Sequence, residues 1–177
     1  VRSSAALEDR ADALGAGIFL SVTDVAAADV PAALREVLCA ALAPAPLAYG
    51  AGAVWVTNEN DGTGSRIGPK RNKVVKTIRV GGKPNGIAVA FGSVWVADYG
   101  RGRLIRLNPV KNRVTGRIAI PTADWITRSG DSLWVSSETG KVYRVDPASL
   151  TLKATVTVGA NPLASAVIGG ELWVPNI

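Results

Sequence analysis

The chain places a tryptophan between two aliphatic residues four times, in Val54-Trp55-Val56, Val94-Trp95-Val96, Leu133-Trp134-Val135 and Leu172-Trp173-Val174. Successive tryptophans are 40, 39 and 39 residues apart. A constant period of this size is typical of stacked structural units, each of which buries its apolar face against its neighbours. We therefore expect a repeat protein with these four tryptophans in its core and its function on its loops.

Other sequence features repeat in register with the tryptophans. A polar residue lies three positions after each tryptophan, and in the first three copies a loop containing glycine follows. An alternating run, a turn with proline and a β-branched run complete the unit, as in 103–107, 108–109 and 114–120. Val, Ile, Thr and Trp favour strands, and Pro after Asn or Asp favours a turn. The pattern predicts an all-β fold, a β-propeller with four-stranded antiparallel blades.

The repeats also set the expected extent of the propeller. Residues 44–81, 82–120 and 121–159 are predicted to form three blades, and residues 160–177 half of a fourth. Because propellers usually have ~4–8 blades, about three and a half blades should leave the ring incomplete. The chain also lacks methionine, so we expect a fragment of a larger propeller; the alternative is an assembly in which several chains complete one ring. The open blade edges favour self-association.

Residues 1–43 differ from the repeats and are expected to form a short α-helical segment. Ser4 is a suitable N-cap for a helix that Gly15 would end, and Pro31 is suited to the first turn of a second helix up to Leu42. The sequence leaves three roles open for this segment: a linker, a remnant of a preceding domain, or a cap on the open propeller edge.

From about Pro44 to Ile177 the chain resembles the bacterial YVTN-repeat and streptogramin lyase (virginiamycin B lyase)-like β-propellers. The resemblance rests on the stretches Gly52-Ala53-Val54-Trp55-Val56-Thr57-Asn58, Asp61-Gly62-Thr63-Gly64-Ser65-Arg66-Ile67, Asn72-Lys73-Val74-Val75-Lys76-Thr77-Ile78 and Lys83-Pro84-Asn85-Gly86-Ile87-Ala88-Val89. It implies a bacterial propeller, with a periplasmic or extracellular location favoured. The resembled group contains lyases that use histidine and magnesium in the channel, and also binding modules.

The composition disfavours catalysis by this chain. Its 177 residues include no histidine and only one cysteine, Cys39. The commonest general base and metal ligand is therefore absent, and no position inherits the catalytic histidine of the resembled lyases. We interpret Cys39 as a buried or incidental residue. We expect no cofactor, with magnesium only if the chain is part of a lyase.

Charge is distributed unevenly along the chain. Residues 1–46 have a net charge of −3, and residues 47–177 have a net charge of +9. Most of the basic residues fall on the predicted outer strands and their turns, where they form either a solvated rim or a surface for an anionic partner. Nucleic acid is disfavoured because no aromatic residues alternate with these charges. No apolar stretch is long enough to span a membrane.

In a propeller, the loops after the second strand of each blade share one face with the loops that lead into the next blade. This face surrounds the central channel and is the default ligand site. We predict contacts there from Trp125, Asn85, Asn161, Asp98, Tyr99, Arg101, Asn58 and Glu138. Trp125 is the leading candidate because its neighbours in register are Gly86 and Ala164, although packing in the channel or against a blade is the alternative. The polar residues after the tryptophans are interpreted as turn-closing residues rather than metal ligands.

Two functions of different classes follow. The first is a non-catalytic propeller module that binds a small molecule or a protein at its channel face. The alternative is a fragment of a streptogramin lyase-like enzyme, a C–O lyase or hydrolase, whose catalytic residues lie outside this chain. An anionic partner on the basic surface is a third, weaker hypothesis.

Overall fold

The structure is a computed structural model that describes residues 47–162 and 164–176. The two helices expected within residues 1–43 lie outside the described residues. The described residues form three four-stranded sheets and one two-stranded sheet, all antiparallel. The only helical element among them is a short 3₁₀ turn, η1 (Tyr99–Arg101).

Within each sheet the strands follow one another in chain order. The first sheet contains β1 (Leu47–Gly50), β2 (Ala53–Asn58), β3 (Thr63–Gly68) and β4 (Lys73–Arg79). The second contains β5 (Pro84–Ala90), β6 (Ser93–Asp98), β7 (Arg103–Asn108) and β8 (Arg113–Ala119). The third contains β9 (Ala123–Ser129), β10 (Ser132–Ser137), β11 (Lys141–Asp146) and β12 (Thr151–Thr157). The last pair is β13 (Ala166–Ile168) and β14 (Glu171–Trp173).

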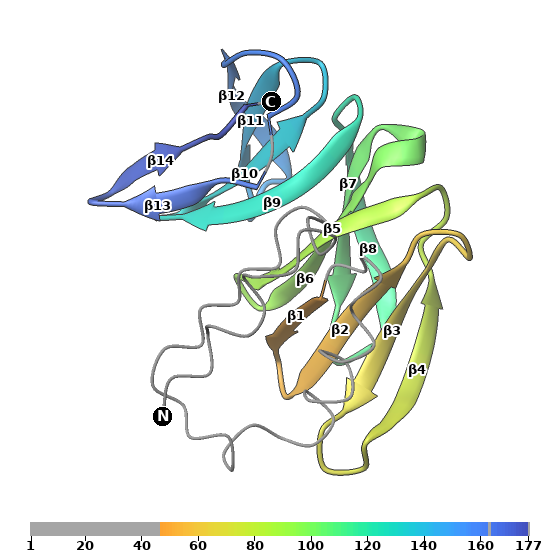
Figure 1. Ribbon diagram of the computed structural model, residues 1–177. Helices are drawn as coiled ribbons and strands as arrows, with labels where there is room; N and C mark the ends of the chain where they lie inside the picture. Colours follow the sequence, from red (N-terminus) through yellow and green to blue (C-terminus); the bar gives the residue numbers. More distant parts are fainter. Residues whose placement is uncertain (1–46, 163, 177) are drawn as a thin grey trace, which may run out of the picture.

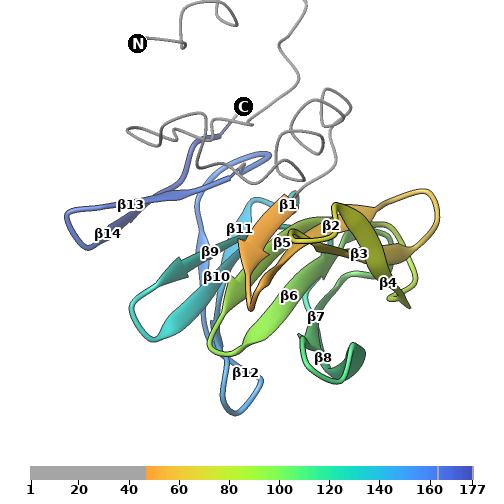
Figure 2. The same cartoon turned by 90° about the horizontal axis from the view of Figure 1, so that it is seen from below.

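The sheets are arranged as blades, with their first strands together. Strand β5 contacts both β1 and β9, whereas the outer strands β4, β8 and β12 lie away from these contacts. Figure 1 shows the sheets fanning out from this line of inner strands, and Figure 2 shows the same arrangement from below. The predicted fold class, an incomplete β-propeller of four-stranded antiparallel blades, is confirmed.

The three complete blades enclose an apolar core between the first and second and another between the second and third. Trp55 of the first blade packs in one cluster with Val94 and Val96 of the second, and Trp95 packs in the next cluster with Leu133 and Val135 of the third. Both indoles are almost fully buried. Their ring N–H groups donate to backbone carbonyls five residues earlier, at 3.1 Å in the first blade and 3.0 Å in the second. The repeated tryptophan therefore packs against the next blade, and its indole N–H group has a hydrogen-bond acceptor within its own blade.

The expectation that all four tryptophans belong to the core is wrong for the last one. Trp134 is only partly buried, and the Trp173 side chain is 57% exposed. Trp134 faces a neighbour with only two described strands, and no further blade is described beyond Trp173. Burial at this position therefore depends on a complete next blade and not on the tryptophan itself.

The outer strand of every complete blade contains a β-bulge at the same point. The register shift leaves Val75, Thr115 or Lys153 without a directly opposed partner on the third strand. A bulge bends its strand and increases its twist. The three outer strands are also the most exposed strands of their blades. Polar residues alternate with apolar ones along them because their outer edges face solvent.

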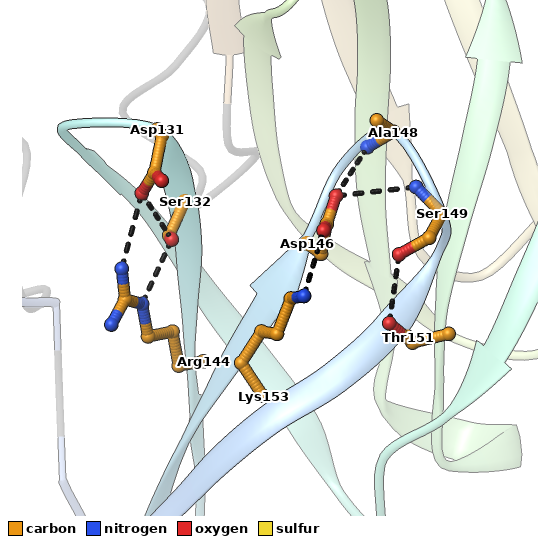
Figure 3. Close-up of polar contacts among 8 residues, drawn as sticks. All are labelled: Asp131, Ser132, Arg144, Asp146, Ala148, Ser149, Thr151 and Lys153. Atoms are coloured by element: carbon orange, nitrogen blue, oxygen red, sulfur yellow. Dashed lines mark hydrogen bonds and ion pairs between the residues drawn. The ribbon is translucent and has the colours of Figure 1, made fainter.

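In the second and third blades, a short polar side chain holds the turn that precedes the outer strand. The Asp146 carboxylate accepts backbone N–H groups from Ala148 at 2.8 Å and Ser149 at 3.2 Å, and Lys153 forms an ion pair with it at 3.2 Å (Figure 3). These contacts, led by the bond from Ser149, lower the pKa of Asp146 to about 2. The turn chemistry expected from the Asp-Pro sequence is thus present.

A recurring glycine fastens each loop after the second strand to the chain that leaves the blade. The carbonyls of Gly62, Gly102 and Gly140 accept the N–H groups of Val80, Ile120 and Val158, at 2.9 to 3.0 Å. All three glycines have a left-handed backbone, with φ of +62°, +57° and +75°. Residues with a side chain adopt this conformation at a cost, which explains the glycine in each repeat. These bonds place two sets of loops on one face.

Candidate functional site

The channel face is built from the loops that the recurring glycine holds together. Because each blade is an antiparallel meander, the β2–β3, β6–β7 and β10–β11 loops lie at the same end as the segments that cross into the next blade. The starts of the inner strands β5 and β9 reach this end as well. The predicted site residues are distributed over these elements.

Asn85 links three blades at this face. Its side-chain amide donates to the carboxylate of Asp124 on the inner strand of the third blade. Its backbone carbonyl accepts the Thr57 hydroxyl of the first blade at 2.7 Å. The inner strands also come very close at Gly86, where a Cβ atom would lie 2.0 Å from the carbonyl oxygen of Asp124. The position of Asn85 is therefore determined by direct contact between inner strands.

Tyr99 and Glu138 meet across the second and third blades. The Tyr99 hydroxyl donates to a Glu138 carboxylate oxygen at 2.8 Å, although the two residues are 39 positions apart in the chain. Each occupies the loop after the second strand of its blade, directly after the polar residue of the repeat. Both of these predicted site residues thus lie on the same face and contact each other.

Several acidic groups affect one another on this face, which also has the exposed cations Lys83, Arg101 and Lys141. Burial raises the pKa of Asp124, and the nearby charges of Glu138 and Glu59 raise it further, against the lowering effect of the bond from Asn85. The hydrogen bond to Glu138 raises the pKa of Tyr99, with a smaller contribution from Asp124. A raised pKa means that the folded chain binds the Asp124 proton more tightly than the unfolded chain does. Protonation of Asp124 therefore stabilises the fold at low pH, and this contribution is lost as pH rises through the raised pKa.

Asp98 has a structural position below the face. Its buried carboxylate accepts the backbone N–H groups of Lys83 at 2.9 Å and Arg101 at 3.2 Å, and forms an ion pair with Arg103 at 2.8 Å. Arg103 also donates to the carbonyl of Val80, at 3.2 Å. Asp98 therefore ties the end of β6 to the segment that enters its blade.

Asn58 and Ser137, which occupy the position of Asp98 in the other two blades, form different hydrogen bonds. Asn58 donates to the hydroxyls of Thr63 and Ser65 across its own hairpin, at 2.9 Å each. Ser137 donates to the carbonyl of Pro121 at 2.7 Å and accepts from the backbone of Thr139 at 3.3 Å. These contacts hold loops in place, as expected for turn-closing residues.

The remaining predicted residues lie around the Asn85 and Tyr99 contacts. Trp125 follows Asp124 on β9, is partly buried and donates its backbone N–H to Ser136 at 3.3 Å. Arg101 is exposed in η1, with its guanidinium against the backbone of Gly81. Asn161 is exposed in the segment that leads into β13 and has a φ of +43°. Trp125 is thus adjacent to Asp124 along β9, with its side chain partly buried.

Two acidic residues that contribute to the electrostatics of this face were not among the eight predicted site residues. Asp124 belongs to the loops expected on this face but was not among the eight, and Glu59 was not predicted at all. Glu59 directly follows Asn58 on the first loop of the face. Its equivalents in register are Tyr99 and Glu138, so the repeat itself carried the signal that would have found it.

The described residues hold no group of three or more acidic, histidine or cysteine side chains arranged to bind a metal ion. The expectation of no cofactor remains a prediction. Within 47–162 and 164–176, no helix is long and apolar enough to cross a membrane.

A hollow of about 670 Å³ lies at the opposite end of the molecule, between the second and third blades. Its lining includes the four charged residues of Figure 3, where Arg144 pairs with Asp131 at 3.1 Å and Lys153 pairs with Asp146 at 3.2 Å. Its charges are therefore largely neutralised by internal pairs. We place the candidate site on the channel face, where Glu138 of the same blade and Glu59 of the first blade both raise the pKa of Asp124.

The sequence matches no protein-family model and no curated protein. Solved structures do resemble the fold. Hydrazine synthase of Kuenenia stuttgartiensis has a TM-score of 0.69 at 13% identity, over 88% of this chain and 45% of that one. Glutaminyl cyclase of Myxococcus xanthus has a TM-score of 0.55 at 14% identity, over 73% of this chain and 66% of that one.

Sqt1 of Saccharomyces cerevisiae has a TM-score of 0.61 at 16% identity, over 71% of this chain and 38% of that one. The chain thus spans less than half the length of hydrazine synthase and of Sqt1. At these identities the likeness concerns the fold alone. The chain has the fold of propeller-like proteins.

Proposed function

We propose that the protein is a non-catalytic β-propeller module that binds a ligand or a protein partner through its channel-face loops. The observation that carries this proposal is the pair of contacts between the second and third blades: Asn85 donates to Asp124, and Tyr99 donates to Glu138. Burial raises the pKa of Asp124, and the charges of Glu138 in the same blade and Glu59 in the first blade raise it further. The carboxylates of this face suit a cationic group, such as a lysine or arginine side chain of a protein partner. Trp125, next to Asp124, adds an aromatic surface for the stem of such a group.

The finer family assignment is also a proposal. The quoted repeat stretches support the YVTN-repeat and streptogramin lyase-like group, and with it a bacterial, periplasmic or extracellular protein. The lyase alternative has no observation in its favour on the described face. Self-association through the open blade edges is supported by exposed apolar residues, among them Trp173 and Ile168.

A cationic peptide tests the proposed site directly. We expect tri-lysine amide, added to the isotope-labelled chain, to shift the NMR signals of Tyr99, Asp124 and Glu138 more than those elsewhere. Glu138→Gln should weaken this binding roughly fivefold, the effect of about 1 kcal/mol from one charge pair. Glu171→Gln removes the same charge from exposed β14 and is the matched control.

Two outcomes would contradict the channel-face proposal. One is a set of shifts spread over the surface without a maximum at Tyr99, Asp124 and Glu138. The other is an equal loss of binding in Glu138→Gln and Glu171→Gln, because general attraction to negative charge would then explain the affinity.

A further inference from the structure

We propose that the rim of the first two blades, at the end opposite the channel face, is a docking surface for an anionic phospholipid membrane. We define this membrane-facing rim as the turns 68–73 and 108–113, which join β3 to β4 and β7 to β8. The proposal is independent of the channel-face function, since the two surfaces lie at opposite ends of the blades.

The first observation is an unbalanced charge. Between residues 62 and 123 there are thirteen basic residues and a single acidic one, Asp98, which is buried and paired with Arg103. This part of the chain therefore exposes no carboxylate. The exposed cations of the membrane-facing rim are Lys70, Arg71, Lys73, Lys111 and Arg113. Like charges this close repel one another, and an anionic surface relieves that repulsion.

The second observation is an apolar residue at the tip of this charged surface. The Val110 side chain is 83% exposed, and its turn is held rigidly: the Asn108 side chain accepts the N–H groups of Val110 at 2.9 Å and Lys111 at 2.7 Å. The Asn112 side chain donates to the Val110 carbonyl at 3.2 Å. Val110 is thus presented to solvent by a closed turn, and the exposed cations Lys111 and Arg113 follow it in the chain.

The two turns belong to one surface. Arg66 on β3 of the first blade donates to the Asn112 side chain in the β7–β8 turn, at 3.3 Å. Val74, 56% exposed at the start of β4, adds a second apolar residue beside Lys73. Cations around exposed apolar side chains are the combination that binds at a lipid interface, where the charges meet headgroups and the apolar tip enters the acyl boundary.

A nucleic acid fits these observations less well. It would use the cations but would have no contact for Val110, and neither turn contains an aromatic residue on which bases would stack. Binding to a membrane should therefore depend on Val110, whereas binding to a nucleic acid should not.

Vesicle sedimentation of the 177-residue chain separates these cases. The probe is vesicles of two parts phosphatidylcholine to one part phosphatidylglycerol, with pure phosphatidylcholine as reference. We expect binding to the anionic vesicles only. The variant Lys70→Gln/Arg71→Gln/Lys73→Gln should bind about a hundredfold more weakly, at roughly fivefold for each cation. Val110→Ser should lose about tenfold, because its apolar side chain no longer enters the interface.

The matched control is Lys83→Gln/Arg101→Gln/Lys141→Gln, which removes three exposed cations from the channel face. It should retain vesicle binding within a few fold, and circular dichroism should give the same β spectrum for all variants. Equal losses in the two triple variants, or unchanged binding by Val110→Ser, would overturn the proposal. Retention of a duplex DNA fragment more tightly than the vesicles, with no effect of Val110→Ser, would instead identify a nucleic-acid surface.

Discussion

Replacing Trp95 by alanine is expected to lower the free energy of unfolding by about 4 kcal/mol. Trp95 is fully buried between the second and third blades, in a cluster with Leu133, Val135 and Val145. The variant would leave a cavity among these side chains and remove the indole N–H bond to the Ala90 carbonyl. Chemical denaturation followed by circular dichroism measures the loss.

Trp173→Ala is the matched control, because Trp173 occupies the same position of the repeat with its side chain 57% exposed. Its effect should be about 1 kcal/mol or less, as for a change at a largely solvated side chain. Losses of the same size in both variants would contradict the account, since burial by the next blade would then not determine the role of the tryptophan.

Asp98→Ala is expected to lower the free energy of unfolding by about 3–5 kcal/mol. The variant removes the carboxylate from a buried position and leaves Arg103 without its ion-pair partner. It also leaves the backbone N–H groups of Lys83 and Arg101 without the acceptor that holds the loop. The same denaturation experiment provides the measurement.

Two comparisons isolate the cause of the Asp98 effect. Asp98→Asn retains an oxygen acceptor for the backbone N–H groups, so its loss should be smaller than that of Asp98→Ala. Asp131→Ala also removes a carboxylate paired with arginine, but the Asp131 side chain is 86% exposed, and we expect little change. A similar loss of unfolding free energy for Asp98→Ala and Asp131→Ala would contradict this account, because burial of the Asp98–Arg103 pair would then not increase its contribution to stability.

The sequence predicted the blades because their signal is local and repeated. Val94-Trp95-Val96, the glycine loop and the Asn108-Pro109 turn each specify a strand or a reversal within a few residues. Their recurrence at a constant period then indicates the stacking of like units. The exposure of Trp173 depends on how much of a neighbouring blade lies against it, which the local pattern of its strand does not specify.

The site was predicted as a face but not as a set of contacts. Position in the repeat was enough to place Tyr99 and Glu138 in equivalent loops. Their hydrogen bond, and that between Asn85 and Asp124, depends on the distance between inner strands, which Gly86 allows to become very short. Asp98 illustrates the same limit: its repeat position indicated a turn, whereas its burial and its pair with Arg103 arise from packing between blades.

The central claim is that the channel face brings Glu59 of the first blade near enough to Asp124 and Glu138 of the third blade to affect the titration of Asp124. The most direct test is an NMR titration of the Asp124 carboxyl carbon in the wild-type chain, in Glu59→Gln and in Glu138→Gln. We predict a wild-type pKa above the ordinary aspartate value that decreases in both variants, while Asp146 titrates at about 2 throughout. An Asp124 pKa at or below the ordinary value, or one that neither variant changes, would contradict the account.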